Sequence, residues 1–273
     1  MDVQRKPAAP RPDRELMSCL GGPFRLHREP CDQQRRPQDA AERHEQVMRD
    51  LVDVTRSSSG VIRIYRPTPT AAFSRRDSQH PGYEHASDAV IGLGFVPTVR
   101  PTAGHLAIYG HGSVILDVVS PHPDPRRDPL GRFATLARLL SRLLISLGAE
   151  ARIGAVDGEY CPGRFSVNAA GQRKLVGLSQ RMTANAYYVG AVIAVEPDKY
   201  ALRATQQAYP LLDLDLDVST FGALAEEVDG ITVDIFIDSL VAMLSCELPL
   251  VVQCHADGMN VPTPMACPSD VTL

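Results

Sequence analysis

The stretch FSVNAAGQRKLVGLSQ, residues 165–180, places a short turn between two segments of alternating apolar residues. Segments 165–168 and 174–180 have the pattern of strands, and the turn at 169–172 contains the glycine that hairpins favour. The stretch therefore predicts an antiparallel hairpin, and the rest of the fold is expected to extend from it.

Strands and helices are interleaved on both sides of this hairpin. Apolar or alternating runs predict strands near residues 61–67, 71–77, 95–101, 106–110, 113–119, 151–155 and 186–195. Apolar residues at helical spacing predict helices over 38–55, within 80–94, and over 129–147, 198–208 and 231–246. This order favours one α+β domain, with a mixed, largely antiparallel sheet flanked by helices.

Three regions differ in composition. Residues 1–37 hold six prolines and a basic excess, so a flexible leader is expected there. Residues 38–247 carry the periodic patterns and are expected to form the folded domain. Residues 248–273 are weakly patterned, and an irregular tail is expected for them.

The composition excludes several classes of protein. The chain has 273 residues, of which 44% are apolar and 22% charged, and its net charge of −4 argues against nucleic acid as the main partner. No apolar run is long enough to span a bilayer. The first fifteen residues lack the apolar stretch of a secretory signal, so a cytoplasmic location is expected. Without export the six cysteines are expected to be free thiols rather than disulfides, and their spacing includes no CxxC pair, which argues against a zinc site.

A glycine-rich segment, RPTAGHLAIYGHGSVILD, occupies residues 100–117. Its glycines leave backbone N–H groups accessible, which suits contact with a phosphate, carboxylate or carbonyl oxygen. The glycines and the polar side chains near them are Arg100, Thr102, Gly104, His105, Gly110, His111 and Gly112. The alternative interpretation is two hairpin turns with solvent-facing histidines.

Cys161 and Lys174 belong to the opening hairpin. Cys161 lies in a Tyr-Cys-Pro-Gly turn before the first strand, and Lys174 begins the returning strand. A turn cysteine beside a cation is a candidate nucleophile, and a desolvated lysine can polarise a carbonyl or neutralise a phosphate. An inert surface thiol and a solvated lysine are the alternative, and these residues alone leave both open.

Taken together, these segments resemble the lipoate–protein ligase and octanoyltransferase family, which shares its catalytic fold with biotin–protein ligases. The order matches over roughly residues 38–245. AAFSRRDSQHPGYEHA resembles the family's strand and loop that carry an arginine, and RPTAG resembles the R-x-T-G-G motif. GQRKLVGLSQRM resembles the (R/K)-K-(V/I/L)-x-G-x-(A/S)-Q segment that carries the family's lysine.

The resemblance implies a role for each matching position. Lys174 would contact the acyl carbonyl or the adenylate, and Arg75 would line the acyl pocket. The loop that closes on the acyl chain would include Gly104, Gly110 and Gly112, while Gly177 and Gln180 would complete the lysine segment. The chain departs from the motif at Ala103, where the family has glycine, and at His105, and this departure bears on the identity of the substrate.

The Tyr160–Gly163 turn is similar to that of one branch of the family, the octanoyl-relay amidotransferases. That resemblance implies that Cys161 takes an octanoyl or lipoyl group as a thioester, without ATP, metal or another cofactor. Lys174 and loop N–H groups would stabilise the oxyanion. A lysine of a lipoyl-carrier domain would then receive the group. The implied partners are the glycine-cleavage H protein, 2-oxoacid dehydrogenase E2 domains or acyl carrier protein.

Two alternatives remain at this stage. An ATP-dependent lipoate–protein ligase would use magnesium and a lipoyl-adenylate, with Lys174 on its phosphate and Cys161 as a bystander. Fewer than thirty residues follow residue 246, too few for the small domain that such ligases usually add. A non-catalytic relative that binds an acyl chain or an acylated carrier is the second alternative, and Ala103 is the reason to keep it.

Overall fold

The computed structural model describes residues 19–29, 39–248 and 250–251. The strands of the described chain are β1 (Phe24–Arg28), β2 (Gly60–Tyr65), β3 (Thr70–Phe73), β4 (Val96–Val99), β5 (Ala107–Tyr109), β6 (Ser113–Pro121), β7 (Ala151–Ile153), β8 (Val167–Ala169), β9 (Arg173–Met182), β10 (Ala186–Ala194) and β11 (Leu250–Val251). Its α-helices are α2 (Asp39–Asp53), α3 (Tyr83–Ile91), α4 (Pro129–Ser146), α5 (Lys199–Leu211) and α6 (Val233–Glu247). Short 3-10 helices are η1 (Val54–Arg56), η2 (Asp77–Gln79), η3 (Val218–Thr220) and η4 (Leu224–Glu226).

Two sheets form the framework. The large sheet has eight strands in the order β11-β1-β2-β6-β10-β9-β8-β7, and the small sheet has three in the order β4-β3-β5. Strands β2, β6, β10, β9, β8 and β7 pair antiparallel in succession, whereas β1 is parallel to both of its neighbours. The predicted α+β class with a mixed, largely antiparallel sheet is confirmed. The second sheet adds a layer that the sequence pattern did not predict.

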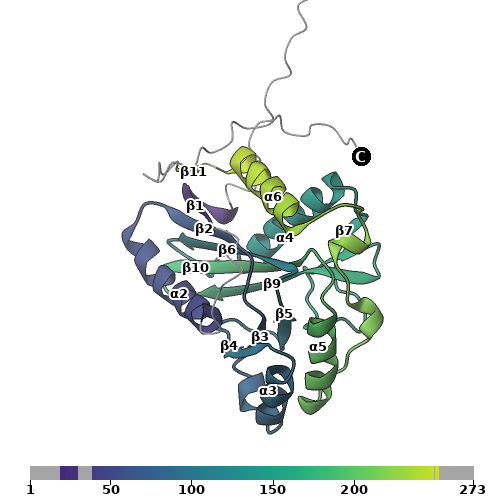
Figure 1. The fold of residues 1–273 in the computed structure, drawn as a ribbon. Coiled ribbons are helices and arrows are strands. Elements are labelled where there is room, and N and C mark those ends of the chain that lie inside the picture. Colours follow the sequence, from purple (N-terminus) through teal and green to yellow (C-terminus); the bar gives the residue numbers. More distant parts are fainter. Residues whose placement is uncertain (1–18, 30–38, 249, 252–273) are drawn as a thin grey trace, which may run out of the picture.

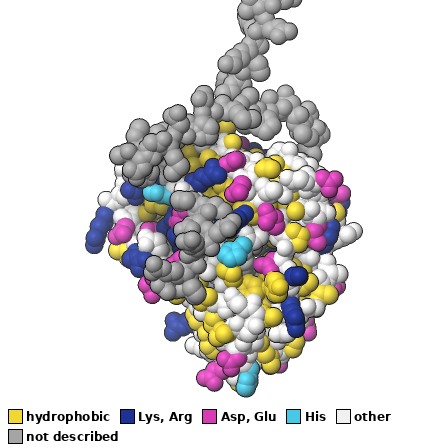
Figure 2. All heavy atoms as spheres, in the orientation of Figure 1, with side chains coloured by type: hydrophobic (Ala, Val, Ile, Leu, Met, Phe, Trp, Pro, Cys, Tyr) yellow, Lys and Arg dark blue, Asp and Glu magenta, His cyan; other side chains and the backbone are white. Residues whose placement is uncertain are grey.

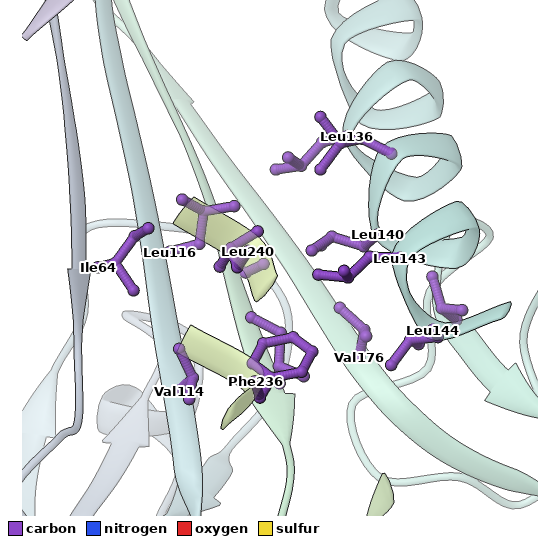
Figure 3. Packing of buried hydrophobic residues seen from close by; sticks show 14 of the residues in the cluster. Ile64, Val114, Leu116, Leu136, Leu140, Leu143, Leu144, Val176, Phe236 and Leu240 are labelled. Atoms are coloured by element: carbon purple, nitrogen blue, oxygen red, sulfur yellow. The ribbon is translucent and has the colours of Figure 1, made fainter. Parts of the chain in front are cut away.

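Helices α4 and α6 cover one face of the large sheet (Figure 1). Helix α4 begins at Pro129 because the Asp128 side chain accepts a hydrogen bond from Gly131 N at 2.8 Å. Its leucines face the strand residues and α6 in one apolar cluster (Figure 3). Each of these side chains stabilises the fold by roughly 1.5–3 kcal/mol on burial. Labelled members are Ile64, Val114, Leu116, Leu136, Leu140, Leu143, Leu144, Val176, Phe236 and Leu240.

Helix α2 packs on the other face of the large sheet. The small sheet lies on that same side, with α3 and α5 packed against it (Figure 1). Val47 and Leu51 of α2 pack against Val61, Val119 and Tyr188 of the sheet. A separate apolar cluster joins β3, β5, α3 and α5. Tyr160 and Cys161, in the turn before β8, pack into this second cluster, and Lys174 of β9 bridges to Phe221 beside it, so the candidate site lies where the β8–β9 hairpin meets the second cluster.

Strand β1 lies within residues 1–37, which were expected to form a flexible leader, so that expectation is wrong for residues 24–28. Phe24 is completely buried, and Gly60 N donates to Pro23 O at 2.8 Å where β1 runs beside β2. Residues 24–28 therefore belong to the large sheet, with Phe24 in the core and Leu26 packed against it, a position that only the folded sheet creates. Residues 1–18 and 30–37, the rest of the expected leader, and residues 249 and 252–273 of the tail lie outside the described residues.

Candidate active site

The Cys161 turn has an unusual backbone. Cys161 adopts φ +41°, a left-handed conformation that costs a non-glycine residue about 1–2 kcal/mol. Hydrogen bonds hold it there: Cys161 N donates to Tyr209 Oη at 2.8 Å, and Tyr209 Oη donates to Leu106 O at 2.8 Å. Helix α5 thus fixes the turn from the side of the small sheet.

The Cys161 thiol is partly buried and free. Its Sγ lies 3.3 Å from the backbone N–H of His105 and 3.5 Å from Nη2 of Arg100. The same Nη2 donates to His105 O at 2.6 Å, which fixes the guanidinium against the thiol. A guanidinium and an N–H directed at sulfur stabilise a thiolate, the nucleophilic form of cysteine.

Gly104 makes this close approach possible. It has φ +107°, and a Cβ at this position would lie 2.7 Å from Arg100 Nη2 and 3.0 Å from Cys161 Sγ. Ala103, by contrast, is exposed and is not among the described residues with positive φ. The methyl group of Ala103 therefore causes no backbone strain, and the glycine that the geometry requires is the second of the motif.

We expect Gly104→Ala to slow alkylation of Cys161 by iodoacetamide, because the new methyl group must displace Arg100 or the thiol. Displacing either group should lower the alkylation rate by roughly 10²-fold, because the reaction needs the thiol and the guanidinium aligned. The alanine should also lower the free energy of unfolding by about 1–3 kcal/mol. Ala103→Gly is the matched control and should change neither quantity. Equal rates for Gly104→Ala and the wild type would contradict the role given to this glycine.

Lys174 is buried in the base of the turn. Its side chain and that of Glu159 are 2% and 0% exposed, with Nζ 3.0 Å from Glu159 Oε1. Nζ also donates to Tyr160 O and Cys161 O, both at 2.9 Å. An ammonium has three N–H donors, and these three contacts use all of them. The contacts therefore favour a role in holding the turn over the direct contact with an acyl carbonyl that the resemblance implied.

Glu159 is saturated in the same way. Oε1 accepts from Gly163 N at 3.1 Å and Ser166 Oγ at 2.6 Å, in addition to Lys174, and Oε2 accepts from Val156 N at 2.9 Å. These donors offset the cost of burying the carboxylate and tie both ends of the turn to it. Gly177 leaves room for the pair, because a Cβ there would lie 3.3 Å from Lys174 Cε.

Several predicted site residues lie elsewhere. Gln180 accepts from Arg132 Nε at 2.7 Å and donates to Pro129 O at 3.1 Å, so it joins β9 to the start of α4. Added Cβ atoms at Gly110 and Gly112 would meet Asp198 and Glu196 before α5 rather than Cys161. His111 between them is exposed, Thr102 is buried, and Arg75 is exposed after β3. The structure thus gathers Arg100, Gly104, His105 and Lys174 around Cys161.

Asp77 reaches the site from the other side of His105. Ser74 N donates to Asp77 Oδ2 at 2.8 Å and Asp77 N to Ser74 Oγ at 3.1 Å, a reciprocal pair that fixes the start of η2. Asp77 Oδ1 lies 3.4 Å from His105 Nδ1, and the Asp77 side chain is 4% exposed. The spacing Ser-x-x-Asp signals the turn, but nothing in the sequence indicates the histidine it faces.

Helix α2 brings His44 towards the same region. Burial, and secondly the charge of Arg100, lower the pKa of His44 to about 4. As pH falls below 6.5 the unfolded chain protonates this histidine while the folded chain does not, so stability is lost on acidification. At pH 4.5 the loss should be roughly 2–3 kcal/mol.

Urea unfolding at pH 7 and pH 4.5, for the wild type and His44→Gln, measures that loss. The variant should lose roughly 2–3 kcal/mol less than the wild type between the two pH values. Equal losses would mean that His44 is not held neutral by the fold.

The chain is similar in sequence to curated octanoyltransferases. It is 24% identical over 124 residues to an octanoyl-GcvH:protein N-octanoyltransferase from Geobacillus kaustophilus, covering 45% of this chain and 44% of that protein. It is 27% identical over 125 residues to the protein of the same name from Exiguobacterium sibiricum, covering 46% and 45%. The matches thus span about half the length of these relatives. No protein-family model matches the chain.

Solved structures extend the likeness over most of the chain. A bi-partite lipoate protein ligase from Thermoplasma acidophilum, studied with its E2 lipoyl domain, has TM-score 0.59 at 17% identity and covers 86% of both chains. A lipoate-protein ligase A bound with ATP has TM-score 0.58 at 17% identity, covering 85% of this chain and 90% of that one. The catalytic-domain fold is shared. The sequence matches and the shared fold together support the resemblance to the lipoate–protein ligase and octanoyltransferase family.

Three residues that the sequence did not predict as part of the site contact it in the folded chain. Glu159, Asp77 and Tyr209 each contact a residue of the predicted site, yet each depends on a partner distant in the sequence. Glu159 and Asp77 have local signals, since Glu159 precedes the Tyr-Cys-Pro-Gly turn that it caps and Asp77 ends a Ser-x-x-Asp turn, whereas Tyr209 has none.

Acidic and basic side chains are interspersed on the face drawn in Figure 2. Among residues 19–29, 39–248 and 250–251, no three or more His, Cys, Asp or Glu side chains form a group that could hold a metal ion. In the same residues each helix is too short or too polar to cross a bilayer.

Proposed function

We propose that the protein transfers an octanoyl or lipoyl group to a lysine of a lipoyl-carrier domain through a thioester on Cys161. The observation that carries the proposal is the Cys161 Sγ, held in a strained turn 3.5 Å from the Arg100 guanidinium and 3.3 Å from the His105 N–H. A strained nucleophile facing a fixed cation is an arrangement that serves covalent catalysis.

The reaction has two attacks. Cys161 thiolate attacks the carbonyl of the donor, the C–S bond forms, and the bond to the donor's nitrogen or sulfur breaks. The ε-amine of the acceptor lysine then attacks the thioester, the C–N bond forms, and the electron pair of the C–S bond returns to Cys161. When donor and acceptor are both lysine amides the exchange is nearly balanced in free energy and needs no ATP.

The names of the relatives suggest the donor and the acceptor. The octanoyltransferases act, by name, on octanoyl-GcvH, and one structural neighbour was studied with an E2 lipoyl domain. For this chain we propose the octanoylated glycine-cleavage H protein, or alternatively acyl carrier protein, as donor and the lipoyl domain of a 2-oxoacid dehydrogenase E2 as acceptor. The catalytic unit would comprise residues 38–247 together with β1, in the cytoplasm where thiols stay reduced. Arg75, Gly110, His111 and Gly112 stay predictions as acyl-pocket residues.

An ATP-dependent ligase is the second candidate, because one structural neighbour binds ATP. In that reaction Lys174 would hold the phosphate of the adenylate. The contacts of Lys174 Nζ with Glu159, Tyr160 O and Cys161 O leave no donor for a phosphate, which supports the thioester reaction instead. Ala103 was the reason to consider a non-catalytic, binding-only protein. Because Ala103 is exposed and its methyl group is compatible with the turn, it does not favour that alternative.

The test is incubation with octanoylated H protein in the absence of ATP, followed by intact mass before and after neutral hydroxylamine. A hydroxylamine-labile octanoyl adduct, mapped to Cys161 by peptide mass spectrometry, is expected. Octanoylation or lipoylation of an E2 lipoyl domain that requires ATP and magnesium, and survives Cys161→Ala, would establish the ligase. Activity in neither assay would leave a binding protein.

A further inference from the structure

Amide exchange requires a group that moves a proton at Cys161. If the proposed function holds with an amide donor, the leaving lysine nitrogen must gain a proton as its C–N bond breaks. In the second attack the incoming lysine nitrogen must lose one. Without such transfer the nitrogen would leave as an anion or arrive as an ammonium, and neither reacts at a useful rate. General acid–base catalysis of this kind is worth about 10²–10⁴-fold.

Three ionisable groups that touch the Cys161 turn are unsuited to the task. Lys174 is buried, and its three donors are used by Glu159 and two carbonyls. Arg100 keeps its proton at any physiological pH. Tyr209 donates to Leu106 O and accepts from Cys161 N, and burial raises its pKa far above the usual value.

His105 has the properties that those groups lack. Its backbone N lies 3.3 Å from Cys161 Sγ, and its side chain is 28% exposed, so substrate can reach the ring. Nδ1 lies 3.4 Å from the buried Asp77 carboxylate without a hydrogen bond to it, and within the described part of the chain Nε2 makes no hydrogen bond either. A separation slightly beyond a hydrogen bond is common where catalytic pairs have no ligand bound.

Asp77 determines which nitrogen is free. A carboxylate beside Nδ1 favours the form of imidazole with hydrogen on Nδ1, which leaves Nε2 to accept and donate a proton. Ser74 fixes Asp77 through two hydrogen bonds, and burial keeps water from competing for it. The other charged or titratable groups facing His105 are Arg100, which donates to its carbonyl oxygen, and the Cys161 thiol, which lies beside its backbone N.

We infer that His105 is the general acid and base of the transfer and that Asp77 positions its ring. In the first attack the His105 imidazolium gives a proton to the leaving nitrogen of the donor, which departs as a neutral amine. In the second attack neutral His105 takes a proton from the attacking amine as the amide forms and Cys161 leaves as thiolate. The imidazolium is thereby restored for the next donor, and no other reagent is consumed.

The test compares two octanoyl donors in single-turnover acylation of Cys161, followed by intact mass. One is octanoylated H protein, whose amide nitrogen needs a proton to leave; the other is octanoyl-N-acetylcysteamine, whose thiolate does not. His105→Gln should lose about 100-fold or more with the amide and stay within a few-fold of wild type with the thioester. Asp77→Asn should show the same selectivity, with a loss of roughly 10-fold or more.

His85→Gln is the matched control, because His85 is an exposed histidine on α3; it should react like the wild type with both donors. Retained thioester reactivity also reports that the variants are folded. Equal losses of His105→Gln with both donors, or none with either, would overturn the role of His105 and leave Cys161 as the nucleophile. If the wild type itself forms no adduct with either donor, the proposed function fails and this inference with it.

Discussion

Replacing Cys161 by serine or alanine is expected to abolish the acyl adduct and to reduce octanoyl transfer to an E2 lipoyl domain by roughly 10³-fold or more. Arg100 Nη2 and the His105 N–H lie 3.5 and 3.3 Å from the Cys161 sulfur, where they can stabilise the thiolate that attacks the donor. A serine hydroxyl remains protonated in the same place and is a far weaker nucleophile. The measurements are intact mass of the enzyme and mass of the acceptor domain.

The same position provides a test of the backbone strain. Both Cys161→Gly and Cys161→Ala lack the thiol, but only glycine adopts φ +41° without cost. We expect the glycine variant to be more stable in urea by about 1 kcal/mol. Cys246→Ala, on α6, should keep the adduct and serves as the control for thiol chemistry elsewhere. An adduct that persists in Cys161→Ala would remove the cysteine from the mechanism.

Breaking the Lys174–Glu159 pair should have the largest effect on stability. Lys174→Met leaves a carboxylate that is 0% exposed without its cation and removes the donor from two carbonyls, which should cost about 3–5 kcal/mol. Glu159→Gln should cost less, because an amide is neutral but cannot accept from all the donors that surround Oε1. The free energy of unfolding in urea gives both values.

A double-variant cycle separates the pair from its surroundings. Lys174→Met with Glu159→Gln should be more stable than the sum of the two single losses predicts, since no unpaired charge remains buried. Arg173→Met is the control on the same strand. Its side chain is 33% exposed and pairs with the partly exposed Glu226 and Glu227, so its loss should cost much less than that of the buried Lys174, about 1 kcal/mol. Strict additivity would contradict direct coupling between Lys174 and Glu159.

The two roles of the turn can be separated with these variants. If Lys174 acts by holding Cys161, its loss should lower stability and slow acylation from amide and thioester donors alike. His105→Gln should instead slow only the amide donor. Different patterns for the two variants would distinguish support of the nucleophile from proton transfer.

The sequence by itself determined most of the local structure. The glycine turn at 171 and the alternation beyond it predicted the hairpin, now β8 and β9, and the leucine spacing predicted α4. These signals are local, because turn conformation and helical periodicity depend on residues a few positions apart. The resemblance also led to Cys161, Lys174 and the Arg100–His105 segment, which the fold brings together.

Only the tertiary structure decided what those residues face. The sequence predicted Lys174 as a substrate-binding cation, and the fold places its Nζ in contact with Glu159 and two backbone carbonyls. Strand β1 pairs with β2, and Asp77 lies beside His105. Neither contact is predicted by a local sequence pattern. Burial and pairing of charged groups depend on segments far apart in the chain. The partners of Cys161, Lys174 and His105 could therefore be identified only from the packed tertiary structure.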